Sequence, residues 1–428
     1  LCHLLLQIKN STKDQLEKKI TKAKEIADTL KWDLVSKRNV NFVNHHSVNF
    51  NDKFSKIGWI STWHEQCGIA LYSKHLIDNI LADVSIFSPK DKSTLSNLGY
   101  NVYPSWNLGA TSNNLQSLKN KILNMNITSL IIQFNYNFFD FEEFNNFIID
   151  LSNESINVII FLHSTIDPIG DNNKKLSNLL TSFEKCKRLM VHTVDDLNRL
   201  KNLGLCDNLC LFPHGILEYN KPKKGLNNIS NLVKSTSKFK LATYGFCLPN
   251  KGYDKLIQAI KILRDKNYKV TLNIFSSIYS DDYYWVYDSL VDLIKESNLQ
   301  KFVKIDINYM SDEDTLEHLS SHDFLVFPYQ PSNESSSASV RHGLATFKPV
   351  LVTPNPIFND VSGLIEYLPG YEADEIADGI ALWIDKKKNI NCTKIESNDR
   401  VSIIQNRHFS KLGFRLSGII KGLEINQD

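Results

Sequence analysis

The residues best suited to chemistry lie between positions 327 and 353, FPYQPSNESSSASVRHGLATFKPVLVT. A short apolar strand leads here into a polar loop with Glu334 and the serines 335–337, then into a helix that carries His342. The first N–H groups of a helix have no partner inside it, so such a turn can bind an anion. A carboxylate or an imidazole beside it can hydrogen-bond sugar hydroxyls. The alternatives are a helix-capping acid for Glu334 and a surface histidine for His342.

A second candidate is the stretch GFCLPNKG at 245–252, which follows an apolar strand and opens an amphipathic helix. Gly245 allows a tight turn, and Lys251 stands at the helix start, where charge and free N–H groups together could hold a diphosphate. The alternative is a solvated lysine, although the helix dipole slightly disfavours a cation there. The stretch is neither GxxxxGK[ST] nor GxGxxG.

Three further positions follow predicted strands. Gly68 in CGIA would let a ligand approach the backbone closely, or it serves strand–helix packing alone. His163 in FLHST and His214 in FPHG each follow a strand, and the ends of parallel strands are where ligands bind. A structural role for each histidine stays open.

Acidic pairs and cysteines give no sign of a metal site. Asp281–Asp282 and Asp312–Asp314 precede helical stretches, where N-capping explains them better than metal binding. The seven cysteines are scattered without a CxxC pair, which is typical of reduced thiols in a cytosolic protein. We therefore predict no metal and no resident cofactor.

The 428 residues suit two domains, with the 42% apolar and 22% charged composition of a soluble globular protein. A net charge of +2 gives no general attraction to nucleic acid. No apolar run reaches membrane-spanning length. The chain starts at Leu1 without Met, so we expect a fragment of a longer protein and leave an upstream segment open.

From position 56 apolar strands alternate with amphipathic helices, a pattern that predicts parallel sheets covered on both faces. The fold class is therefore α/β, with two Rossmann-like doubly wound domains facing a cleft and an extra N-terminal helical segment. The predicted divisions are an N-terminal helical extension or linker, a first Rossmann-like domain, a polar linker, a second Rossmann-like domain and a final helix that packs back on the first domain. Their bounds are 1–54, 55–216, 217–238, 239–405 and 406–428.

Taken in chain order over about residues 56–425, the motifs described above resemble those of the GT-B glycosyltransferases of family 4. The resemblance implies a retaining, metal-independent enzyme that uses a nucleoside-diphosphate sugar as co-substrate. It makes residues 55–216 the acceptor domain and residues 239–405 the nucleotide-sugar domain. It implies that Glu334 contacts the donor sugar, that Lys251 and the serines 335–337 hold the diphosphate, and that His342 replaces the glutamate that usually binds ribose. It also places Gly68 near the diphosphate and His163 near the reacting sugar.

Two departures from the family stand out. Cys247 and Leu248 occupy the place where an arginine usually accompanies the lysine, and His342 replaces a glutamate. The resemblance still favours an active enzyme that moves a hexose-type sugar from a UDP- or GDP-linked donor to a glycan, lipid-linked or protein acceptor. It points to surface polysaccharide or glycoconjugate synthesis in the cytoplasm, with contact to the inner face of a membrane left open. The alternative is a non-catalytic nucleotide- or glycan-binding module of a larger protein.

Overall fold

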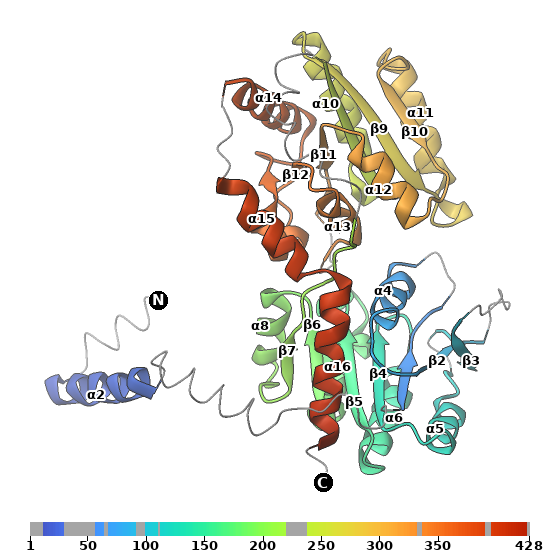
Figure 1. Cartoon of the computed structure of the whole chain (residues 1–428), viewed down its shortest axis with the longest axis vertical. Helices are drawn as coiled ribbons and strands as arrows, with labels where there is room; N and C mark the ends of the chain where they lie inside the picture. The colour runs from blue at the N-terminus through green and yellow to red at the C-terminus, as the bar shows by residue number, and fades with distance from the viewer. Residues whose placement is uncertain are drawn as a thin grey trace. The chain divides into compact units, whose positions relative to one another are not determined.

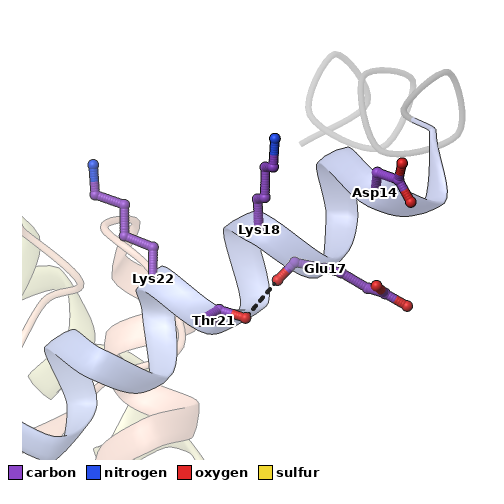
Figure 2. Close-up of a pocket in the computed structure, with 5 residues that line it drawn as sticks. All are labelled: Asp14, Glu17, Lys18, Thr21 and Lys22. Atoms are coloured by element: carbon purple, nitrogen blue, oxygen red, sulfur yellow. Dashed lines mark hydrogen bonds between the residues drawn. The ribbon is translucent and has the colours of Figure 1, made fainter.

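The computed structural model describes residues 12–29, 56–63, 67–90, 99–109, 112–219, 238–331, 336–389 and 395–425. The chain divides into two units, Leu1–Lys53 and Phe54–Asp428. In the first unit, helix α2 (Lys13–Thr29) confirms the extra N-terminal helical segment of the predicted fold class. Figure 2 shows a shallow pocket along α2, lined by Asp14, Glu17, Lys18, Thr21 and Lys22. Because all five come from one exposed helix, the pocket does not identify a functional site.

The second unit begins with a sheet of seven parallel strands in the order β3-β2-β1-β4-β5-β6-β7. Every residue of the central strands β4 and β5 is buried. Such strands need apolar side chains on both faces, which explains why apolar runs predicted them. The strands are β1 (Ile57–Ile60), β2 (Val84–Pro89), β3 (Asn101–Trp106), β4 (Ser129–Phe134), β5 (Asn157–Leu162), β6 (Arg188–Val191) and β7 (Leu209–Leu211).

Helices connect and cover this sheet (Figure 1). In α6 the Asp140 carboxylate caps the first turn by accepting a hydrogen bond from the Glu143 N–H. The helix then buries an apolar face that includes Phe144 and Leu151. The helices are α4 (Gly68–Ile77), α5 (Leu115–Asn124), α6 (Phe141–Asn153), α7 (Leu180–Lys185) and α8 (Val194–Asn202).

The second sheet has six parallel strands in the order β10-β9-β8-β11-β12-β13. It confirms the second Rossmann-like half of the fold class. Apolar runs do not predict β13, because its two residues are exposed and form no such run. The strands are β8 (Lys238–Phe246), β9 (Lys269–Ser277), β10 (Val303–Asp306), β11 (Phe324–Phe327), β12 (Val350–Val352) and β13 (Glu366–Tyr367). Residues 220–237, most of the predicted linker, lie outside the described residues.

Six helices of the described residues accompany these strands or follow them. Short 3-10 turns precede two of them, at Pro249–Lys251 before α10 and at Asp281–Tyr283 before α11. The helices are α10 (Tyr253–Asp265), α11 (Tyr284–Glu296), α12 (Asp312–Ser320), α13 (Ala338–Ala345), α14 (Ala373–Asn389) and α15 (Ile395–Asn406).

The last helix, α16 (Phe409–Ile425), packs against the first sheet and not the second. Leu412 and Leu416 are fully buried among residues of β1 and α4, and Figure 1 shows α16 along that sheet. The Ser417 hydroxyl also accepts a hydrogen bond from the Leu81 N–H at 3.1 Å. The chain thus crosses between the two sheets twice.

None of the helices in the described ranges is both long and apolar enough to cross a membrane. The five cysteines that these ranges contain, among them Cys67 and Cys247, are free thiols.

Gly252 is a position where the backbone demands glycine, since its φ is +66° and a Cβ there would lie 2.0 Å from the Pro328 carbonyl oxygen. We expect Gly252→Ala to lower the free energy of unfolding by at least about 2 kcal/mol, from left-handed strain and overpacking. Urea denaturation measures this change. Gly68→Ala is the matched control, because no atom of the described residues lies within 4 Å of its Cβ position. Equal stability of the two variants would contradict the steric argument.

Candidate functional site

Three histidines follow three adjacent strands of the first sheet. His163 follows β5, His192 follows β6, and His214 lies three residues after β7. Their rings are in contact, with centroids 5.2 Å apart for His163 and His192 and 5.3 Å apart for His192 and His214. The Tyr72 ring of α4 packs on all three at 4.8–5.3 Å. We call these four side chains the histidine cluster.

Burial sets the charge of the histidine cluster. It lowers the pKa of His163, and the neighbouring His192 lowers it further. Burial also lowers the pKa of His192 and of His214, and the Arg341 guanidinium adds to both effects. Burial raises the pKa of the Tyr72 hydroxyl. All four side chains are therefore neutral near pH 7.

The second sheet contributes Gly245 and Lys251 at the end of β8. Gly245 has a φ of +148°, and its Cβ position lies 3.1 Å from the Ser339 hydroxyl, so the loop runs close to α13. Lys251 is buried, only 6% exposed, and its ammonium nitrogen lies 4.1 Å from the centre of the Tyr329 ring. A cation over an aromatic face is held there electrostatically. The alternative of a solvated lysine is therefore excluded.

The start of α13 lies beside the same tyrosine. Ser337 is its N-cap, with a hydroxyl that accepts from the Val340 N–H and donates to the Tyr329 hydroxyl, both at 3.3 Å. Tyr329 thus joins Lys251 to the helix start, which brings two of the predicted anion-binding elements together. Glu334 and Ser335 lie outside the described residues, whereas Ser336 is described just before the cap.

His342 has both ring nitrogens engaged. Its Nδ1 lies 3.1 Å from the Ala338 carbonyl oxygen and its Nε2 3.0 Å from Asp312 Oδ1. The Ala338 carbonyl and the Asp312 carboxylate therefore occupy both ring nitrogens of His342. In this arrangement neither nitrogen remains for a ribose hydroxyl.

Asp312 is shared between the two halves of the second unit. Its other oxygen lies 3.1 Å from His75 Nε2 on α4. Burial raises the pKa of Asp312, but the contacts with His342 and His75 outweigh burial and hold it well below its ordinary value. A second contact joins Asn359 Nδ2 to Asp195 Oδ2 at 3.2 Å. The ends of the strands of the two sheets therefore face each other.

The expected N-caps among the acidic pairs are wrong. Ser311 caps α12, since its hydroxyl accepts from the Asp314 N–H at 3.1 Å, which leaves Asp312 free to bind the imidazoles. Ser280 and Tyr283 precede the helical turns near Asp281, and neither turn has a side-chain cap bond. A serine one position before an acidic run is the signal that sequence reasoning overlooked.

Gly68 begins α4, where Cys67 occupies the cap position without a side-chain cap bond. No atom of the described residues lies within 4 Å of its Cβ position, so strand–helix packing does not require glycine there. The structure also reveals Arg341, which is 2% exposed and paired with Asp360. In the described ranges no set of three His, Cys, Asp or Glu side chains has the geometry of a metal site.

No protein-family model matches the chain, and no curated protein matches its sequence. Its structure is similar to a glycosyltransferase from Rickettsia africae, with a TM-score of 0.68 and 12% identity over 87% of this chain and 100% of that one. It is also similar to Anabaena HepE in complex with UDP-glucose, with a TM-score of 0.63 and 14% identity over 86% of this chain and 99% of that one. Sucrose-phosphate synthase from Thermosynechococcus elongatus has a TM-score of 0.63 and 12% identity over 87% of this chain and 100% of that one. The chain has the GT-B fold.

The neutral histidine cluster makes stability depend on pH. Because the folded pKa values lie below the ordinary value of about 6.5, the unfolded chain binds more protons there, and the free energy of unfolding rises with pH. As pH falls below about 6.5, each of these histidines lowers the free energy of unfolding by up to about 1.4 kcal/mol per pH unit.

We expect His214→Asn to reduce the slope of the free energy of unfolding against pH by up to about 1.4 kcal/mol per pH unit. Urea unfolding between pH 7.5 and 5.5 measures this slope. His318→Asn, at an exposed position of α12, is the control. A His214→Asn slope as steep as that of the wild type would contradict the buried neutral state.

Proposed function

We propose that the protein is a retaining glycosyltransferase that moves a hexose-type sugar from a nucleoside-diphosphate sugar to a hydroxyl acceptor. The observation that carries the proposal is the contact of Lys251 and the α13 start through Tyr329, on the side of the GT-B fold that faces the histidine cluster. HepE, one of the structures with this fold, has been solved with UDP and with UDP-glucose. We therefore take a UDP-sugar as the first donor to test.

The donor's diphosphate would lie against Lys251 and the free N–H groups at the start of α13, near Ser336 and Ser337. Fixed positive groups aimed at developing charge accelerate a reaction because they need no reorganisation when the bond breaks. The open start of α4 at Gly68 would offer further N–H groups. These groups would supply the charge compensation that a metal ion gives elsewhere, so we propose that the transfer is metal-independent.

The sugar would lie between these phosphate-binding elements and the histidine cluster. Glu334 would accept hydrogen bonds from its hydroxyls, and His163 would border its reacting face. In a retaining transfer the acceptor hydroxyl attacks from the side that the leaving phosphate vacates, so the phosphate itself can take the acceptor's proton. We propose a role in the synthesis of surface polysaccharide or glycoconjugates in the cytoplasm, with a glycan, a lipid-linked sugar or a protein as acceptor.

A non-catalytic nucleotide- or glycan-binding module is the second candidate. Two observations favour it: Cys247, in the place of the family's arginine, is fully buried and brings no charge, and His342 has both nitrogens engaged. Incubation with UDP-, GDP- and other nucleotide sugars separates the two functions. Release of free nucleotide that is lost in Glu334→Ala supports the enzyme, whereas binding without turnover under every acceptor supports the module.

Lys251→Met should reduce turnover by about 100- to 1,000-fold, the usual cost of removing one preorganised group from developing charge. Methionine keeps an apolar chain against Tyr329 while removing the ammonium group, so the fold should survive. Initial rates of nucleotide release measure the effect.

Lys255→Met, on the exposed side of α10, is the matched control. Lys255 pairs with Glu372 at 2.5 Å, and surface pairs of this kind contribute little. Turnover of Lys251→Met close to that of Lys255→Met would rule out the assigned role of Lys251.

A further inference from the structure

A line of four groups runs through the buried part of the histidine cluster. The Gln133 side-chain amide lies 2.7 Å from His163 Nε2, and His163 Nδ1 lies 3.4 Å from His192 Nε2. His192 Nδ1 then lies 3.0 Å from the Phe212 carbonyl oxygen. Gln133 and His192 are almost completely buried, so water does not compete for these contacts.

The Phe212 carbonyl fixes the protons along this line. A carbonyl only accepts, so His192 Nδ1 carries a hydrogen, and the neutral ring then has a lone pair at Nε2. That lone pair accepts from His163 Nδ1–H, which leaves the His163 lone pair at Nε2. The group that faces it must donate, and in Gln133 only the NH2 end can do so.

The Gln133 amide agrees with this assignment, because its NH2 group is buried without a partner among the described residues while its Oε1 lies toward His163. With the lone pair of His163 at Nε2, that Oε1 would face another acceptor. Rotating the amide by 180° exchanges the two ends, removes the acceptor–acceptor contact and gives the NH2 group its partner. The opposite tautomer of His163 would instead place two lone pairs face to face between His163 and His192.

We propose that His192 is a positioning residue that holds His163 neutral, with its proton on Nδ1 and its Nε2 lone pair bound to Gln133. Both nitrogens of His163 are then engaged within the protein, so His163 borders the sugar without giving or taking a proton. This consequence rests on the proposed function and leaves the departing phosphate as the group that receives the acceptor's proton. The proton arrangement itself can be measured without turnover.

Charged and titratable groups from the neighbouring elements surround the rings of His163 and His192 and influence whether these rings are protonated. Protonation of His192 would place a cation near the Arg341 guanidinium in a buried site, and protonation of His163 would place a buried cation against His192, so both are costly. The groups are Tyr72 of α4, Asp196 of α8, His214 after β7, Arg341 of α13 and Asp360 after β12.

Long-range 1H–15N NMR of the 15N-histidine-labelled full chain tests the arrangement, with the His163 signals assigned by their loss in His163→Gln. We expect a protonated Nδ1 and an unprotonated Nε2 between pH 6 and 8. A protonated Nε2, or protons on both nitrogens, would overturn the proposal. If the tautomer is as expected but no nucleotide sugar is turned over, the proposed function fails while the arrangement stands.

Two variants test the role of His192. His192→Phe removes the acceptor, and we expect a mixture of His163 tautomers and a kcat about 5- to 10-fold lower, the value of one lost hydrogen bond. The KM for the donor should change less than kcat. His192→Gln, whose amide oxygen can replace the Nε2 acceptor, should restore both the tautomer and most of kcat. A single unchanged tautomer in a folded His192→Phe would show that His192 does not position His163.

Discussion

A parallel strand buried on both faces can carry polar side chains for chemistry only where it ends. Strands β4 and β5 are buried at every position, and their neighbours satisfy their backbone groups. Chemistry is therefore confined to the last residues of the strands, such as Gln133 in β4, and to the residues that follow them. The histidine cluster, the loop that ends with Lys251, and the start of α13 all obey this constraint. Strand order then decides which of these residues meet, because β5, β6 and β7 are adjacent.

Two features keep the edges of the sheets opposed. The first is α16, which follows the second sheet in the chain but buries Leu412 and Leu416 against the first. The second is Asp312, whose carboxylate is shared by His342 of the second half and His75 of the first. The Asp312 carboxylate is partly exposed, and with an imidazole on each oxygen it loses one of its two contacts if either imidazole moves away. His342 thus contributes to holding the two halves together.

Sequence could predict the strands because buried parallel strands are continuous apolar runs, and it could place Lys251 because that residue opens a helix after such a run. It could not predict β13, which has no apolar run. Nor could it find His192 or Arg341, since their partners come from distant segments that only the strand order brings near. The role of Asp312 was hidden for the same reason, because its two histidines lie on α4 and α13. Side chains whose role depends on several elements leave no local pattern.

The charges of the described residues show where a diphosphate could be stabilised. Arg341 does not offer a second cation to a diphosphate, since its guanidinium is bound to the Asp360 carboxylate, which Arg407 also contacts at 3.3 Å. The histidine cluster is neutral, and Cys247 brings no charge. The compensation that two cations usually share would then fall on Lys251 and the helix N–H groups. Burial strengthens each of these interactions because the surrounding dielectric is low. A lysine held over Tyr329 away from water would therefore act more strongly on a leaving phosphate than the same lysine would in contact with water.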